Sequence, residues 1–219
     1  MKQRLGVLVA VGVLALGAAG TGTAQASPDT RDCPAGEIFA TNNTAVITDP
    51  GDARLRTRLT RFDHEVRAII RTHGARPGES TLLDGVFWSG DLKQTTYERS
   101  REFDVERAGA DGLHHIADVI RKQYHQESVL TFRCLPRTSP DTDAVEIQAP
   151  GVSAVRLREA LLANPEARER LGGGSVTLGG RLVLIAPIAD LPLARRLTAE
   201  LGVDWNTAKL RYGDEEFVS

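Results

Sequence analysis

The sequence predicts an α+β protein of two ferredoxin-like modules in tandem, each with the element order β-α-β-β-α-β, an antiparallel sheet and both helices on one face. Three observations support this fold class. Each half holds two stretches of apolar residues at helical spacing, and strand-like patterns flank those stretches. A polar linker at 137–143, which follows Pro136 and contains Pro140, separates the halves. The first module should span 27–136 and the second 144–219.

The N-terminal segment has the features of a secretory signal peptide. Lys2 and Arg4 precede the apolar run Leu5–Ala19, and Ala24-Gln25-Ala26 is a small-x-small cleavage site. A run of about 15 residues is too short to span a bilayer as a helix. We therefore expect residues 1–26 to be removed and the mature protein to be secreted or extracytoplasmic, without stable membrane insertion; an uncleaved anchor is the alternative.

The charge balance argues against nucleic-acid binding. The chain has 27 Lys and Arg against 29 Asp and Glu, a net charge of −2, and loss of the basic signal residues makes the mature chain more acidic. Proteins that bind nucleic acid generally present a basic surface to the phosphates. We therefore expect no nucleic-acid partner, while a hydrophobic content of 41% is typical of a soluble globular protein.

The first module should open with a short strand at Glu37–Thr41 and continue with an amphipathic helix. Asp49 is a good N-cap and Pro50 has no N–H to leave unpaired, so we expect the helix to begin there and to end at Gly74. Residues at spacings of three and four give this helix one apolar face: Leu55, Leu59, Phe62, Val66, Ile69 and Ile70.

Two further strands, a second helix and a last strand complete this module. Thr81–Trp88 and Thr95–Val105 are strand candidates joined by the turn Ser89-Gly90-Asp91, and Glu127–Arg133 alternates as a final strand. A helix begins at Ala110, after the strand Thr95–Val105 and before the final strand. Its apolar stripe is Leu113, Ile116, Ala117, Ile120 and Tyr124.

The two cysteines are predicted to form a disulfide. In a ferredoxin-like topology the first and last strands are neighbours, and Cys33 precedes the first while Cys134 ends the last. An exported protein matures in an oxidising compartment, where such a bridge would stabilise the fold by about 2–4 kcal/mol. Two buried thiols are the alternative.

The second half repeats the element order more compactly. We expect four strands and two helices in the same order as in the first module, although the two halves share no clear residue identity. The sheets could pair edge to edge or pack face to face as a pseudo-dimer, and a single larger α/β domain is the alternative. The elements are Val145–Ile147, Ser153–Leu162 with a further turn to Leu171, Val176–Leu178, Arg181–Ala186 after Gly179-Gly180, a helix capped by Asp190, and Lys209–Tyr212.

Three short motifs occur in order in the first half: Thr81-Leu82-Leu83-Asp84 with Trp88, then Glu98-Arg99-Ser100, then Tyr124 with Gln126-Glu127-Ser128-Val129-Leu130. Their order resembles that of a family of short exported bacterial proteins known as a domain of unknown function, over about Glu37–Leu135. The resemblance implies export and a ferredoxin-like fold but no reaction. This chain departs from the family in its polar third strand and in the additional residues after 143.

A candidate ligand pocket surrounds the third strand. Its even positions from Glu98 to Glu106 are polar, and Arg99 and Arg101 fall on the register of the core residues. These arginines could pair with Asp84 or Glu127 and line a site for a small anionic ligand. A bulge that turns both arginines to solvent is the alternative, and the one that we favour.

Other clusters favour ordinary surface structure. His114 and Asp118 have the i, i+4 spacing of metal ligands, which His64 or His125 could extend, but no zinc motif is present. The basic stripe Arg54, Arg58 and Arg61 lacks the interleaved aromatic residues of a base-stacking surface. We expect no metal and no cofactor.

The predicted function follows from these absences. We expect an exported, non-enzymatic binding or interaction module whose partner is another protein, a cell-wall component or a small anionic ligand. The alternative is a small secreted enzyme with a polar pocket between the two modules, formed by Arg99, Arg101, Glu98 and Glu127.

Overall fold

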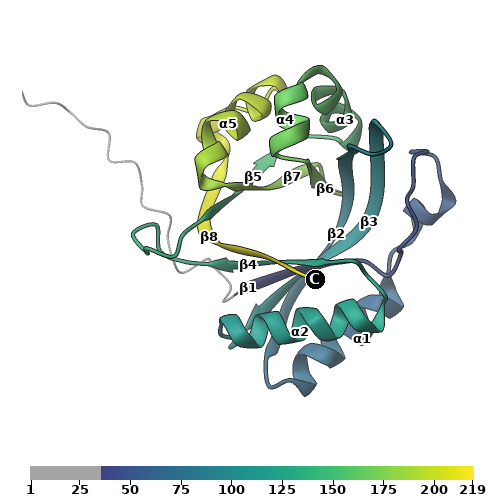
Figure 1. The fold of residues 1–219 in the computed structure, drawn as a ribbon, viewed down its shortest axis with the longest axis vertical. Helices are drawn as coiled ribbons and strands as arrows, with labels where there is room; N and C mark the ends of the chain where they lie inside the picture. The colour runs from purple at the N-terminus through teal and green to yellow at the C-terminus, as the bar shows by residue number, and fades with distance from the viewer. Residues whose placement is uncertain (1–35) are drawn as a thin grey trace, which may run out of the picture.

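Eight antiparallel strands close into one barrel in the computed structural model, which describes residues 36–219 (Figure 1). Around the barrel the strands run β1-β3-β2-β6-β7-β5-β8-β4, and β4 pairs back onto β1. The strands are β1 Gly36–Ala40, β2 Arg76–Ser89, β3 Gln94–Glu106, β4 Val129–Cys134, β5 Ala144–Pro150, β6 Gly173–Thr177, β7 Arg181–Pro187 and β8 Lys209–Val218.

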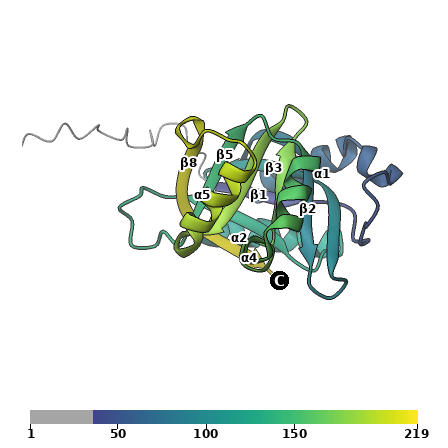
Figure 2. The same cartoon turned by 90° about the horizontal axis from the view of Figure 1, so that it is seen from above.

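The helices lie outside the barrel on two opposite sides. In Figure 1, α1 and α2 lie below the strands and α3, α4 and α5 above them, and Figure 2 shows α4 and α5 over the barrel from that upper side. Their bounds are α1 Thr60–Thr72, α2 Ala110–Gln123, α3 Ala154–Ala163, α4 Pro165–Arg170 and α5 Leu191–Glu200, with 3-10 turns η2 Ala53–Arg56, η3 Ile188–Asp190 and η4 Trp205–Thr207.

The predicted fold class, two ferredoxin-like modules in tandem, is wrong because the two halves share one closed sheet. The edge of β2 pairs with β6, from Leu83 opposite Thr177 to Phe87 opposite Gly173. The edge of β4 pairs with β8, from Val129 opposite Val218 to Cys134 opposite Gly213. Pairing at both seams satisfies backbone groups that an isolated module would leave at exposed edges. The segment 137–143 is a loop between β4 and β5 within that barrel.

Two apolar clusters fill the space between the helices and the barrel wall. One packs Phe62 and Val66 of α1 and Ile120 of α2 against Ile38 and Phe103. The other joins α3, α4 and α5 to the outer faces of β5, β7 and β8, and includes Leu157, Leu161, Leu184, Leu197 and Val145. Because successive strand residues point to opposite faces, every second residue of these strands faces the inside of the barrel.

The first helix begins later than its sequence signals indicate. Asp49 and Pro50 lead into a loop, Leu55 lies in the 3-10 turn η2, and Leu59 adopts a left-handed conformation with φ 52° just before α1 begins at Thr60. The predicted apolar face from Phe62 onward is nevertheless buried, as is the predicted stripe of α2 except for Tyr124, which is half-buried at the C-cap. Helical periodicity thus located the helices well, but the capping pattern placed the start of α1 wrongly.

Two predictions fall outside the described residues. These are the signal peptide at 1–26 and the position of Cys33, so the bridge from Cys33 to Cys134 stays a prediction. Within residues 36–219, no helix is long and apolar enough to cross a membrane.

Candidate functional site

Charged side chains gather inside the barrel, where an apolar core would be the usual filling. Four of these residues are almost fully buried, with exposed fractions of 1% for Glu37 of β1, 5% for Glu102 of β3, 0% for Glu146 of β5 and 6% for Arg211 of β8. Their outward-facing neighbours, such as Ile38 and Phe103, belong to the apolar cluster under α1 and α2. Strand alternation therefore places these charged residues on the inner face of the barrel, which they share with apolar residues such as Phe132, the partner of Glu37 on β4.

Arg211 links two sides of this interior. Its guanidinium forms ion pairs with Glu37 and with Glu146, the residue directly opposite it on β5. Glu37 lies beyond the intervening strand β4, so Arg211 reaches across the inner surface of the barrel. Charged groups this deeply buried are tolerated only when opposite charges or hydrogen bonds compensate them.

The acids outnumber the bases that contact them. Burial and the neighbouring Glu146 raise the pKa of Glu37 well above its usual value, although Arg211 acts in the opposite direction. The same two causes raise the pKa of Glu102 to about 7, and burial also raises the pKa of Asp104. Glu102 Oε2 is buried and has no hydrogen-bond partner within the described part of the chain.

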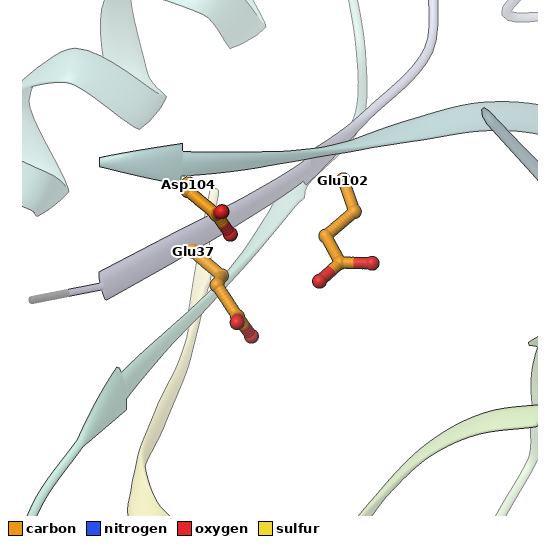
Figure 3. Close-up of side chains that lie close together, drawn as sticks. All are labelled: Glu37, Glu102 and Asp104. Carbon is orange, nitrogen blue, oxygen red and sulfur yellow. The ribbon is translucent and has the colours of Figure 1, made fainter. Parts of the chain in front are cut away.

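Three of these acids converge on one point. Glu37 and Asp104 are direct partners across β1 and β3, and Glu102 lies two residues before Asp104 on the same face of β3. One carboxylate oxygen from each lies within 4.8 Å of the others. Figure 3 shows the three side chains projecting to the same side of their strands. Such a group, which we call the inner carboxylate cluster, can hold protons or a cation.

A second candidate site lies at one mouth of the barrel. A cavity of about 490 Å³, which we call the mouth pocket, is enclosed by the loop after β1, the β2–β3 hairpin and the turn before β4. It is lined by Thr41, Asn43, Thr44, Ala45, Val46, Ile47, Phe87, Trp88, Ser89, Thr96, Tyr97, Glu98, His125, Gln126, Glu127 and Ser128.

Local contacts hold the walls of the mouth pocket in place. The loop after β1 turns back so that Ile47 forms a β-bridge with Tyr97. The N–H of Thr41 donates to Gln126 Oε1, which ties this loop to the turn before β4, while Gln126 Nε2 is buried and has no hydrogen-bond partner among residues 36–219. The guanidinium carbon of Arg168 lies 4.2 Å from the ring centre of Trp88. The pocket therefore has aromatic lining residues, and one of its lining residues, Gln126, carries an unsatisfied hydrogen-bond donor.

The predicted pocket residues divide between two places. Glu98 and Glu127 both line the mouth pocket, and burial raises the pKa of Glu98 while a hydrogen bond with Ser100 lowers it. Asp84 and Arg99 face the helix side instead, where Arg99 Nη1 lies 2.6 Å from Asp84 Oδ1 and Arg99 Nε donates to the carbonyl of Leu55.

Arg101 also lies on the helix side of β3. It donates to the hydroxyl of Ser80 and to the carbonyl of Arg58, and its Nε lies 3.5 Å from Asp63 Oδ1. The β2–β3 register is continuous across these positions, so no bulge turns the arginines outward. They stay on the core register and are compensated there by acids and carbonyl groups.

The histidine and arginine clusters form local ion pairs. His114 Nδ1 lies 2.8 Å from Glu216 Oε1, and Asp118 binds Arg121 and Lys122 instead of a histidine. Along the basic stripe, Arg54 pairs with Asp52 and Arg61 with Glu65. His114, Asp118, Arg54 and Arg61 are thus engaged by neighbouring side chains.

Sequence reasoning missed the inner carboxylate cluster and Arg211. The polar even positions of β3 were visible, but an alternating polar row is also what a solvent-facing strand shows. The signal that could have found the site is the recurrence of such rows in both halves, at Glu102 and Asp104 in β3, at Glu146 and Gln148 in β5, and at Arg211 in β8.

The comparisons with known proteins do not assign this chain to a family. No family model matches this chain, and no curated protein matches it. A solved structure of a provisionally named monooxygenase from Lactobacillus acidophilus has 11% sequence identity and a TM-score of 0.27, over 86% of this chain and 97% of that chain. A similarity of this size carries no statement about fold or activity, and the resemblance to a domain of unknown function stays a prediction.

Proposed function

We propose that this protein is an exported binding protein for a small organic cation, which it holds in the mouth pocket. The observation that carries the proposal is an aromatic wall next to the carboxyl groups of Glu98 and Glu127 in one cavity of about 490 Å³. Cavities of this size hold small molecules. Aromatic rings and carboxylates both attract ammonium groups, so their combination selects for positive charge.

The charges around the pocket favour a cation over an anion. Glu98 and Glu127 are its acidic lining residues, with His125 as the one titratable base among the lining residues. Arg99 and Arg101, the side chains that an anionic ligand would need, are engaged by Asp84, by Asp63 and by carbonyl groups on the helix side. An anion in the mouth pocket would therefore face the carboxyl groups of Glu98 and Glu127 without a guanidinium from β3, while the guanidinium of Arg168, on α4, packs on the ring of Trp88.

Binding is also better supported than catalysis. An acyl- or group-transfer site needs a nucleophile in contact with a base, and that base held by a third group. His125 and Ser128 both line the pocket, but within residues 36–219 the histidine hydrogen bonds belong to His73 and His114. The mouth pocket thus presents recognition groups without an assembled catalytic set.

Tryptophan fluorescence tests the proposal. Trp88 lines the pocket and Trp205 packs in the opposite half, so Trp205→Phe leaves Trp88 as the reporter. The mature protein is titrated in EDTA with two cations, choline and benzylamine, and with their neutral counterparts 3,3-dimethyl-1-butanol and benzyl alcohol. We expect a saturable change in fluorescence with at least one cation, and we expect its neutral counterpart to bind at least tenfold more weakly.

Variants locate the binding site. Glu98→Gln keeps the shape of the side chain and removes the charge, so it should weaken cation binding about tenfold, as loss of a charged hydrogen bond does. Glu159→Gln, an exposed position on α3, is the matched control and should change nothing. Equal binding of the neutral compounds, an unchanged response in Glu98→Gln, or no saturable binding of either cation would overturn the proposal.

A further inference from the structure

We propose that Glu37, Glu102 and Asp104 form a site for one divalent cation of the calcium type inside the barrel. The site is separate from the mouth pocket. Glu98 and Glu102 lie on the same face of β3, four residues and about 13 Å apart along the strand. The proposal therefore does not depend on what the mouth pocket binds.

The geometry suits a hard cation. The ligand oxygens lie within 4.8 Å of one another, so a point between them is at most about 2.8 Å from each. A small movement of the side chains would bring all three into the range of about 2.3–2.6 Å for Ca²⁺. Two of the ligands are fixed by the pairing of Glu37 with Asp104, and Glu102 follows from strand alternation. The three ligands therefore come from adjacent, hydrogen-bonded strands, which hold ligand positions more firmly than a loop does.

The unpartnered group inside the cluster is the second observation. Glu102 is only 5% exposed, and its Oε2 atom has no hydrogen-bond donor within the described residues. An ionised carboxyl group in such a place is unfavourable unless a cation or donor compensates it. A cation bound between the three carboxyl groups would supply that missing partner.

The surrounding charges point the same way. Arg211 is shared between Glu37 and Glu146, which leaves Glu102 and Asp104 without a contacting base among the described residues. A divalent cation would bring the four acids and the arginine close to neutrality. Burial is the largest cause that raises the pKa values of all three proposed ligands, although the charge of Arg211 acts in the opposite direction on each of them and that of Arg181 on Glu102 and Asp104.

The ligand types select among metals. Three carboxyl groups without histidine or cysteine favour Ca²⁺, Mg²⁺ or Mn²⁺ over Zn²⁺ or copper. Mg²⁺ demands shorter bonds and usually keeps several waters, while Ca²⁺ accepts irregular oxygen sites. We therefore assign Ca²⁺ as the preferred ion and Mn²⁺ as its spectroscopic probe.

Direct binding measurements test this site in the absence of any organic ligand. The mature protein is stripped with EDTA and titrated calorimetrically with CaCl₂, and Mn²⁺ binding is followed by the loss of the free-ion paramagnetic resonance signal. We expect one ion per chain, competition between Ca²⁺ and Mn²⁺, and a thermal midpoint that rises with Ca²⁺. Absence of Ca²⁺ and Mn²⁺ binding up to millimolar concentration would refute the site.

Three variants separate this site from surface binding. Glu102→Gln and Asp104→Asn should each weaken Ca²⁺ binding at least tenfold, while the surface control Glu159→Gln should bind as the unaltered protein does. Glu102→Gln also removes an unpaired buried charge, so without metal we expect its thermal midpoint to equal or exceed that of the unaltered protein. If both ligand variants fold and still bind Ca²⁺ with unchanged affinity, the ion lies elsewhere and the proposal is wrong.

The two proposals can fail independently. Loss of Ca²⁺ binding in Glu102→Gln leaves the choline and benzylamine titrations, done in EDTA, unaffected. Conversely, Glu98→Gln tests the mouth pocket without touching a proposed metal ligand. A variant that loses its fold is recognised by its far-ultraviolet circular dichroism, and the remaining ligand variant then decides the outcome.

Discussion

At the scale of single residues, Arg211 has an unusual position. It is 6% exposed and forms ion pairs with Glu37 and Glu146 inside the barrel. A buried ion pair adds little net stability compared with apolar packing, because desolvation offsets the attraction. Removing one partner is different, since it leaves the other charges buried and uncompensated.

Arg211→Met should therefore destabilise the protein by about 3–5 kcal/mol, as loss of one partner from a buried ion pair does. The control is Arg196→Met, which breaks the surface pair with Glu166 and should cost about 0–1 kcal/mol. Chemical denaturation of the mature protein measures both free energies of unfolding. Similar values for the two variants would mean that the interior tolerates unpaired carboxyl groups, against the charge argument made for the inner carboxylate cluster.

At the scale of elements, two glycines allow the seams of the barrel to close. A Cβ atom on Gly213 of β8 would collide with the ring of Phe132 and the carbonyl of Arg133, both on β4. At the other seam, Gly173 of β6 has φ 159° and lies against the backbone of Val86 and Phe87. The pairing of β8 with β4 and of β6 with β2 thus depends on backbones that approach closely.

Gly213→Ala should destabilise the fold by about 1–3 kcal/mol, because overpacking at the β4–β8 seam forces Phe132 or the backbone to move. Gly179→Ala is the matched control: it lies in the β6–β7 turn, and its new Cβ would contact only the hydroxyl of Thr177, at 3.8 Å. Thermal denaturation compares the two. If Gly179→Ala lowers the midpoint as much as Gly213→Ala does, close approach at the seam is not the cause.

At the scale of the whole molecule, the two halves complete each other. The first half alone would expose the edges of β2 and β4, which pair with β6 and β8 in the barrel. It would also expose the polar inner face with Glu102 and without Arg211. Exposed edges of this kind lead to association with other chains.

A chain ending at residue 136 should therefore fail to behave as a folded monomer. We expect it to dimerise through the edges of β2 and β4 or to precipitate, whereas the full mature chain elutes as a single species. Size-exclusion chromatography with light scattering distinguishes these outcomes. A stable, monomeric first half would show that closure of the barrel is not needed for its fold, in favour of independent modules.

Much of the local structure could be predicted, and the reasons are local. The apolar stripes of α1 and α2 report burial directly, since any helix packed on a sheet needs such a face. Of the candidate site, Glu98 and Glu127 were found and do share one pocket. The bulge that we favoured for Arg99 and Arg101 is wrong, because both stay on the core register, and a sequence pattern does not show that Asp84 and Asp63 engage them there.

By itself the sequence determined where the helices and most strands lie, because hydrophobic periodicity and turn residues act over short distances. Only the tertiary structure decided that β2 pairs with β6 and β4 with β8. These pairings close the strands into one barrel, so that one face of every strand lies inside it. The physical reason is that edge pairing uses backbone groups, which every residue carries. A row of polar residues that faces the barrel interior therefore has the same sequence pattern as a row that faces solvent, and only the pairing of the strands distinguishes the two.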